Sequence, residues 1–494
     1  MSEKSSPASS ASPPPLPPKP WERLADFSDK LSPMLVKELR QGLRTNTFVI
    51  LFLVLQALLG LILLTTAAAD TNAGTLVSGI IFCLFSLSVL VIQPLRGIGA
   101  ISSEVKGDTI DLMVLTKLSA WRIVYGKWSS LIGQSALILS TIIPYLILRY
   151  FFGGMQLFSE LLLLLSLFLL SGLFTALTIG VSGSALALVR VIPLIGAILL
   201  VFPIFMFAFG EFGMLLELFT PEDLDHWLIL CGCYLLIIYL TYFFLELGTS
   251  FIAPAAENRA TLKRLIAAPV VLLPTLLFLF IEEDMAWTYA LVLLCLITFD
   301  LFTERDEFPS IVTRPFLRWG LMGRLIGRLL YPGWATGTLF HSLLFLLIMA
   351  AGFSFGSHLD SEELQEGTGI IFGALQFGLL LVNLFRRVLH DRFTAYILIT
   401  TVLCVLIPLF GILYEVNSEN MIWFFCFIPH IQPWMAFEID PSKDISLMII
   451  WGSAFAYFAV NLILAFPRLR QLSQLEEEEL VIVSEKERKD AGES

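Results

Sequence analysis

Residues 48–69 read FVILFLVLQALLGLILLTTAAA, and residues 76–95 read LVSGIIFCLFSLSVLVIQPL. A helix needs roughly 20 apolar residues to cross a bilayer, and each stretch supplies them without an interrupting charge. The whole chain shares this character, because 57% of its 494 residues are hydrophobic and 15% are charged. A soluble protein is about half apolar and about a quarter charged. We therefore expect an all-α fold, a polytopic transmembrane helical bundle.

Apolar runs of this kind recur thirteen times along the chain. They lie near residues 47–69, 75–95, 128–150, 159–189, 191–210, 227–248, 265–281, 286–302, 335–353, 368–386, 393–413, 421–437 and 445–466. Lys and Arg favour cytoplasmic loops, and thirteen crossings would place the two basic termini on opposite sides. The run 421–437 is broken by Pro429 and Pro433. If it does not cross, every Lys and Arg except Arg149 and Lys443 falls on the cytoplasmic side. We predict about twelve spans, both termini cytoplasmic, and a re-entrant or outer-surface segment at 421–437.

Several functions are not indicated by the sequence. The net charge is -11, and no basic cluster is interleaved with aromatic residues, so nucleic-acid binding is not expected. The six cysteines form no C-x-x-C pair and the five histidines are scattered, so neither a metal nor another cofactor is predicted. The chain also lacks G-x-x-x-x-G-K-[ST], because Gly126-Lys127 is followed by Trp128. We expect no enzymatic activity in this chain itself.

The N-terminal region divides into a tail and a helix. Residues 1–31 are rich in Pro and Ser, without the apolar core of a signal peptide, which predicts a disordered cytoplasmic tail. Ser32-Pro33 is typical of a helix start. In the helix that follows, Lys37, Arg40 and Arg44 share one face, and apolar side chains occupy the other. This pattern predicts an interfacial helix whose basic face contacts membrane lipid headgroups.

The connection between the second and third spans, residues 96–127, is too long to be a simple linker. It mixes charges with apolar anchors, and Asp108-Thr109 could cap a short helix within it. A short rigid helix outside the bilayer, joined directly to two spanning helices, is suited to docking a partner protein. A partner that pushed on it would move both spans.

This connection resembles the coupling region of the type-two ABC permease family, the membrane subunits of ABC-type transporters. The family pattern is E-x-x-x-x-T-[LI]-[DE]-x-[LM], then T-x-L-S, then G-K before the third span. The matching positions are Glu104, Thr109, Ile110, Asp111, Met113, Thr116, Leu118, Ser119, Gly126 and Lys127. Asp108 and Lys117 stand where the family usually has Gly and Pro. The resemblance covers roughly residues 33–250, and it implies that a separate nucleotide-binding ATPase docks on this element.

Family permeases commonly have six spans and work in pairs, so twelve spans suggest two fused halves, at 32–253 and 254–466. The cytoplasmic amphipathic segment 303–334 would then stand at the position of the coupling element, although an interfacial helix accounts for it more simply. One such chain could form a whole pore or half of one, which leaves a homodimer open. Residues 467–494 carry the run Glu476–Glu479 and are expected to form an acidic cytoplasmic tail, either a solvated helix or a disordered segment.

The sequence thus predicts the permease subunit of an ABC-type transporter, an exporter in a bacterial inner (plasma) membrane. The alternative is a membrane carrier, or a structural subunit of an envelope complex, without ATP coupling. Carriers often place charges inside the bilayer. Here Glu160, Glu246 and Asp300 come nearest, but they lie close to predicted helix ends, where snorkelling or capping would account for them.

Overall fold

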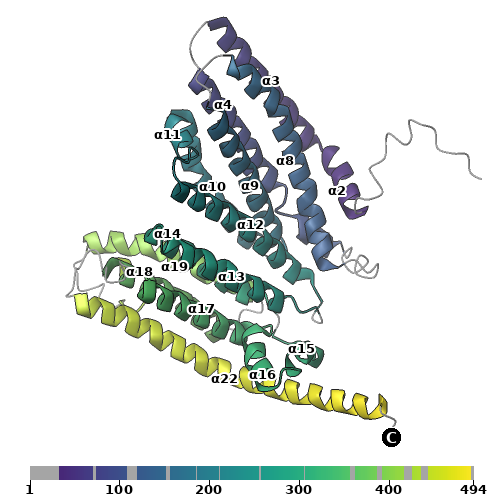
Figure 1. Ribbon diagram of the computed structural model, residues 1–494, viewed down its shortest axis with the longest axis vertical. Helices are drawn as coiled ribbons and strands as arrows, with labels where there is room; N and C mark the ends of the chain where they lie inside the picture. The colour runs from purple at the N-terminus through teal and green to yellow at the C-terminus, as the bar shows by residue number, and fades with distance from the viewer. Residues whose placement is uncertain are drawn as a thin grey trace, which may run out of the picture.

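The computed structural model describes residues 33–69, 74–107, 119–151, 156–184, 186–210, 212–254, 257–304, 306–355, 362–385, 392–416, 426–434 and 443–490. These residues form helices and connections, with no strand among them (Figure 1). Within this part of the chain, ten helical segments are long and apolar enough to cross a membrane. The prediction of an all-α bundle with many spanning helices is therefore confirmed at that level. The predicted tail 1–31 lies outside the described residues.

Six long helices form the N-terminal group. They are α3 (Asn46–Ala69), α4 (Gly74–Ser86) with its continuation to Lys106, α8 (Ala120–Tyr150), α9 (Leu157–Val181), α10 (Ala187–Gly210) and α12 (Leu224–Ile252). The closest packing joins α9 to α12. A Cβ atom added at Gly180 would lie 2.3 Å from the carbonyl oxygen of Phe244, and one at Gly248 would lie 3.1 Å from the Cα of Gly180. Small residues therefore let these two backbones touch.

The second span is interrupted before it reaches the predicted coupling element. The π-helix η1 (Leu87–Ile92) follows α4, and the one-turn α5 (Gln93–Leu95) contains Pro94. A proline cannot donate the backbone hydrogen bond that a regular helix would need there. The chain then turns into α6 (Ala100–Lys106). Single π turns in α-helices are frequently found at functional sites.

Six further long helices form the C-terminal group: α13 (Ala260–Phe278), α14 (Glu283–Leu301), α17 (Trp334–Phe355), α18 (Glu362–Leu384), α19 (Arg392–Val416) and α22 (Lys443–Asp490). Here α18 packs along α22 as α9 packs along α12, and α19 packs on α18 as α10 packs on α9. Glycine again allows the contact, since a Cβ at Gly369 would lie 2.6 Å from Ile450 of α22. A short helix precedes the last long helix in each group: α11 (Phe212–Glu217) and α21 (Gln432–Trp434).

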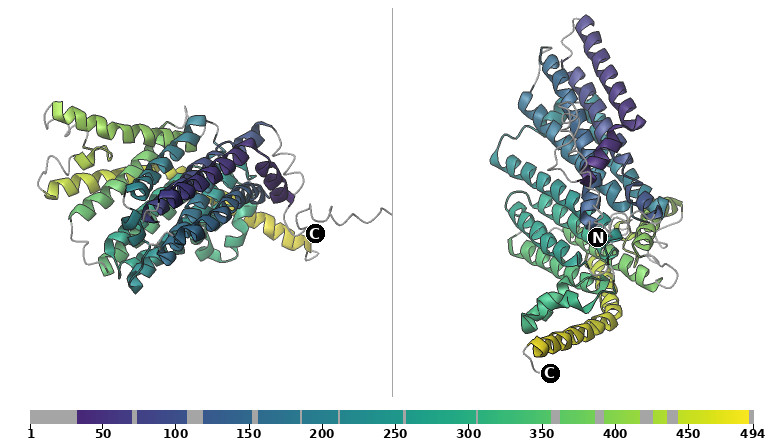
Figure 2. Two further views of the ribbon diagram at one scale, coloured as in Figure 1. Left: turned by 90° about the horizontal axis from the view of Figure 1, so that it is seen from above. Right: turned by 90° about the vertical axis from the view of Figure 1, so that its right-hand side faces the viewer.

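The two groups meet along α12 and α13, which are joined by a short connection (Figure 1). The two turned views also place the purple-to-teal and green-to-yellow helices side by side (Figure 2). An apolar cluster crosses the boundary between the groups, because Val181, Val189 and Leu247 pack with Phe302 and Phe393. The groups are therefore joined by buried apolar side chains as well as by the chain itself.

The described part of the predicted non-crossing segment 421–437 is residues 426–434. It consists of turns and the one-turn helix α21. Gln432 is fully buried and donates to the carbonyl of Cys426 at 3.1 Å and to the hydroxyl of Ser453 at 2.9 Å. Ser453 belongs to α22, so this turn is fastened to the last long helix. The re-entrant or outer-surface location stays a prediction.

Part of the predicted acidic tail 467–494 is helical, which is one of the two expected alternatives, but two of its acidic side chains are buried and not solvated. The helix α22 continues without a break to Asp490 (Figure 1). Glu476 and Glu479, three residues apart, are 1% and 2% exposed. Glu479 accepts hydrogen bonds from the hydroxyl of Ser310 and from Nε of Arg314, both at 2.8 Å. The helix therefore packs on the segment 310–317, where pairing with a buried carboxylate replaces the expected hydration.

Candidate functional site

Lys127 is the centre of a polar cluster at the start of α8. Its ammonium group lies 3.0 Å from a carboxylate oxygen of Glu104 in α6 and 3.2 Å from one of Glu38 in α2 (Pro33–Leu43). Lys127 is 8% exposed. One lysine thus ties the helix before the first span to the end of the segment after the second span.

The glycine that precedes this lysine, Gly126, allows two helices to pack closely. A Cβ atom at Gly126 would lie 2.9 Å from the Cγ of Met34. The bare glycine backbone lets α2 approach α8, and Lys127 then anchors α2 through Glu38. The adjacent pair Gly126-Lys127 therefore has one role in packing and one in charge pairing.

Arg96 makes a second connection to the N-terminal helix. Its guanidinium donates to the hydroxyl of Thr45 at 2.9 Å, to the carbonyl of Gly42 at 3.2 Å and to the buried side chain of Gln134. Thr45 lies in the turn between α2 and α3, and Gln134 lies on α8. The end of the second span is thus held to the first and third.

Helix α6 is also fastened to the fourth and fifth long helices. The backbone N–H of Ile101 donates to the hydroxyl of Ser182 at 3.1 Å, and Arg190 donates to the hydroxyl of Ser102 at 2.7 Å. The side chain of Ile101 is 1% exposed and packs with Val124 and Ile179. Contacts from α2, α8, α9 and α10 therefore hold the start of the predicted coupling element.

The structure describes only some of the predicted coupling residues. Glu104, Gly126 and Lys127 lie close together, as just described. Thr109, Asp111, Met113, Thr116 and Leu118 lie outside the described residues. On the predicted interfacial helix, Lys37, Arg40 and Arg44 are exposed. Sequence reasoning missed Glu38, although the spacing of Met34 and Glu38 by four residues places both on the face that meets α8.

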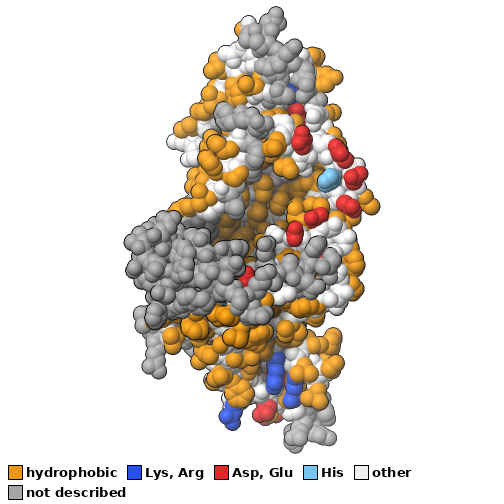
Figure 3. All heavy atoms as spheres, turned by 90° about the vertical axis from the view of Figure 1, so that its left-hand side faces the viewer, with side chains coloured by type: hydrophobic (Ala, Val, Ile, Leu, Met, Phe, Trp, Pro, Cys, Tyr) orange, Lys and Arg blue, Asp and Glu red, His pale blue; other side chains and the backbone are white. Residues whose placement is uncertain are grey.

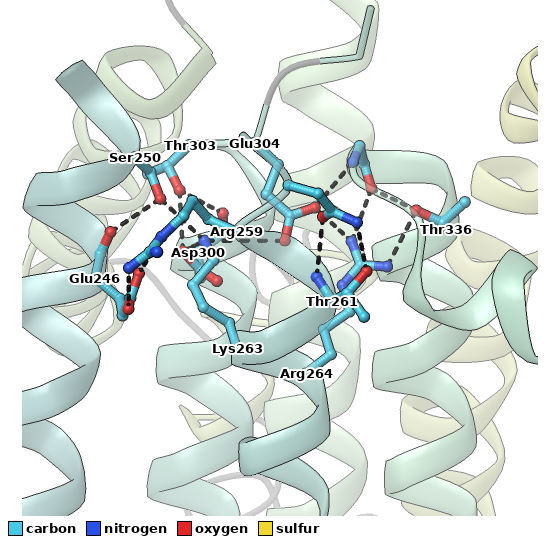
Figure 4. Close-up of polar contacts among 12 residues, drawn as sticks. Glu246, Ser250, Arg259, Thr261, Lys263, Arg264, Asp300, Thr303, Glu304 and Thr336 are labelled. Carbon is cyan, nitrogen blue, oxygen red and sulfur yellow. Dashed lines mark hydrogen bonds and ion pairs between the residues drawn. The ribbon is translucent and has the colours of Figure 1, made fainter. Parts of the chain in front are cut away.

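A second polar cluster, which we call the ionic network, lies where α12 ends and α13 begins (Figure 4). Its first member is a two-point ion pair. Arg259 donates from Nη2 to Oε1 of Glu246 at 2.6 Å and from Nε to Oε2 at 3.1 Å. Glu246 is 1% exposed. A bidentate arginine–carboxylate pair is geometrically specific, so it fixes the angle between the end of α12 and the start of α13.

The second pair of the network joins α13 to α14. Nζ of Lys263 lies 2.6 Å from Oδ1 of Asp300 and 3.2 Å from the hydroxyl of Ser250 (Figure 4). The hydroxyl of Thr303 also donates to Asp300, at 3.0 Å. Since Ser250 belongs to α12, the ammonium group of Lys263 bridges both helix groups.

The third pair fastens the loop that enters α17. Nη2 of Arg264 lies 2.5 Å from Oε2 of Glu304, and Nη1 donates to the carbonyls of Leu329 and Tyr331 at 2.7 and 2.8 Å. Glu304 accepts the backbone N–H of Gly333 at 2.9 Å. Burial raises the pKa of Glu304 above its ordinary value, and the positive charges of Arg264 and Lys263 oppose that rise.

The ionic network was only partly foreseen. Glu246 and Asp300 were singled out, but the expected snorkelling does not occur, because both carboxylates are buried in ion pairs. Glu160 is likewise 1% exposed and pairs with Arg149 at 2.6 Å. Charges buried in this way are costly unless they are paired. The arrangement can therefore hold helices together. Separating any one pair would leave a buried charge without its partner, which would destabilise this packing of the helices.

A scan against family models, a search of curated proteins and a search of solved structures found no match to this chain. Among the described residues, no three His, Cys, Asp or Glu side chains come together as a metal ion would require. The two polar clusters and the helix packing around them are therefore the basis for assigning a function.

Proposed function

We propose that this chain is the transmembrane permease subunit of an ABC-type transporter, an exporter in a bacterial inner membrane. A separate nucleotide-binding ATPase would dock on the element 96–127. One observation carries the proposal: Glu104 and Lys127, two residues of the family-like pattern at its opposite ends, form an ion pair at 3.0 Å. This ion pair accounts for the presence of both residues in the pattern, because it holds the two ends of the element 96–127 together beside the spanning helices.

The same contacts suggest how force would reach the membrane. Lys127 joins α6 and α8 to α2, and Arg96 joins the second span to the turn before α3. A displacement of the element would therefore move the first three spans as a unit. Such a rigid-body shift of one helix group against another is a common route between two states. The broken helix at η1 would provide the bend between this unit and the rest of the second span.

The proposal includes twelve spans with both termini in the cytoplasm. The helices α10 and α19, of 24 and 25 residues, lie at the two predicted spans beyond the ten candidates. The division into halves at 32–253 and 254–466 is favoured by the matching order of helix packing in the two groups. We propose that one chain supplies both halves of the permease, with 303–334 at the position of the second coupling element.

Affinity purification from native membranes in mild detergent tests this proposal. We expect a nucleotide-binding ATPase in fixed stoichiometry, identified by mass spectrometry, and its loss on Asp111→Arg within the coupling pattern. The variant Arg470→Asp, at an exposed position of α22, is a matched charge reversal that should retain the ATPase. Recovery of the folded wild-type chain without any ATPase would contradict the proposal.

The alternative, a carrier without ATP coupling, is favoured by one observation. Lys263, Asp300 and Glu304 are ionisable groups buried where two helix groups meet, as in the ion pathways of many carriers. A carrier would move its substrate in proteoliposomes that contain this chain alone and an ion gradient. Transport that requires both the ATPase and ATP would exclude this alternative.

A further inference from the structure

A half-open apolar cavity of about 420 Å³ lies between the two helix groups. Its walls come from both groups: α9, α10 and α12 on one side, α14 and α19 on the other. Phe243, Phe244 and Leu247 of α12 face Phe299 of α14 and Ile397 of α19 across it. A space-filling view shows a hollow with hydrophobic walls on the molecule, with acidic side chains gathered beside it (Figure 3).

The cavity offers very little to a polar ligand. Its polar lining side chains are Thr400, Thr401 and Cys404, all on α19. The hydroxyl of Thr401 already donates to the carbonyl of Ile397 at 2.7 Å. An apolar ligand pocket of 300 to 1,000 Å³ typically carries a few convergent polar groups, and here those groups sit on a single helix.

Water is a poor occupant of this half-open cavity, because it does not fill apolar cavities that offer it no hydrogen bonds. Helices α9, α12 and α14 in its walls are long and apolar enough to span a bilayer, so the surrounding solvent is hydrocarbon. A flexible apolar chain is therefore the occupant that both the volume and the lining favour.

No charged residue of the ionic network lines the cavity. Leu247 in its wall directly follows Glu246, whose carboxylate is held by Arg259. The glycine contact between Gly180 and Phe244 seals the same region between α9 and α12. Since no charged side chain lines the cavity, the polar headgroup of a lipid would stay outside it.

We propose that this cavity is a binding site for the hydrocarbon chain of a membrane phospholipid. The assignment does not depend on an ATPase, because binding requires only the two helix groups. It adds a ligand class that the proposed permease function does not specify. The residues that contact the chain are Phe243, Phe244, Leu247, Phe299 and Ile397.

Photolabelling tests the site directly. The full chain is placed in nanodiscs of phosphatidylethanolamine and phosphatidylglycerol, doped with a phosphatidylethanolamine that carries a diazirine in its acyl chain. After irradiation, mass spectrometry locates the label. We expect labelling of the α12 peptide around Phe243 and Leu247, although these side chains are only 5% and 2% exposed. Leu346 of α17, which is 58% exposed, reports ordinary contact with bilayer lipid.

Two variants keep the test decisive. Leu247→Trp fills the cavity and should reduce labelling of the α12 peptide several-fold, with labelling at Leu346 unchanged. Phe299→Ala enlarges the cavity and should increase it, which covers the case in which the tryptophan variant does not fold. Unlabelled cavity residues in a wild-type sample that is labelled at Leu346 would overturn the proposal. So would equal labelling in the wild-type, filled and enlarged proteins. No ATPase is present, so neither result depends on the proposed transport function.

Discussion

Glu246 and Arg259 form a buried two-point ion pair between the last helix of the N-terminal group and the first of the C-terminal group. The two contacts measure 2.6 and 3.1 Å, and the glutamate side chain is 2% exposed. The same arginine also contacts Glu257 at 3.2 Å, but that carboxylate is 29% exposed. One guanidinium therefore has a buried partner and a partly hydrated one, which provides an internal comparison.

We expect Glu246→Gln to destabilise the protein by about 3 to 5 kcal/mol, because it leaves Arg259 with part of its charge uncompensated. Glu257→Gln is the matched control and should cost less than about 1 kcal/mol, since the contact is close to solvent. Thermal unfolding in one detergent, monitored by tryptophan fluorescence, measures both variants. Equal melting temperatures for the two variants would show that burial of Glu246 has no energetic consequence.

The ionic network should make stability depend on pH through Glu304. Burial raises the pKa of this carboxyl above its ordinary value of 4.5, so the folded state binds its proton more tightly than the unfolded state does. This contribution to stability is fully present below pH 4.5 and is lost as the pH rises through the raised pKa.

The test compares melting temperatures of the wild-type protein and Glu304→Gln between acidic and neutral pH. The variant cannot titrate at this position, so the difference between the two proteins should change with pH in the direction given. A pH-independent difference, or a wild-type protein that gains stability relative to the variant as the pH rises, would contradict the prediction.

The contact between α9 and α12 should tolerate no side chain at Gly180. An alanine there would place its Cβ 2.3 Å from the carbonyl oxygen of Phe244, and overpacking of this kind typically costs about 1 to 3 kcal/mol. Gly60 of α3 has no neighbouring atom within 4 Å of such a Cβ. Gly60→Ala should therefore be neutral or stabilise by up to about 1 kcal/mol, through helix propensity. Thermal melts of the two alanine variants decide between these expectations.

The end of α22 should detach when its buried carboxylate is removed. Glu479→Ala takes away the acceptor for Ser310 and Arg314, so we expect faster amide exchange over roughly residues 470–485 and 310–317. Glu478, the exposed neighbour, supplies the control Glu478→Ala. Hydrogen–deuterium exchange with mass spectrometry reads both segments. Unchanged protection in Glu479→Ala would mean that apolar contacts, such as that of Leu472, hold the helix without the ion pair.

The lengths of the apolar runs predicted the positions of the long helices well, because a spanning helix is encoded in a continuous run such as 48–69. The sequence did not show which charged residues form pairs. Lys263 and Asp300, for example, are 37 residues apart, and no local pattern pairs them. A signal was available for Glu476 and Glu479, whose separation by three residues places them on one helix face. Glu38 had the same kind of signal relative to Met34. Pairing across helices depends on packing angles, which the sequence does not display.

The most direct test of the proposed coupling is ATP hydrolysis by the co-purified ATPase, measured in nanodiscs with and without this chain. Lys127→Met removes the charge that joins Glu104 to Glu38, and Arg470→Met removes an exposed charge on α22 as the control. We predict that the wild-type chain and Arg470→Met stimulate hydrolysis, and that Lys127→Met, still folded by size-exclusion chromatography, does not. Full stimulation by folded Lys127→Met would contradict a coupling role for this cluster.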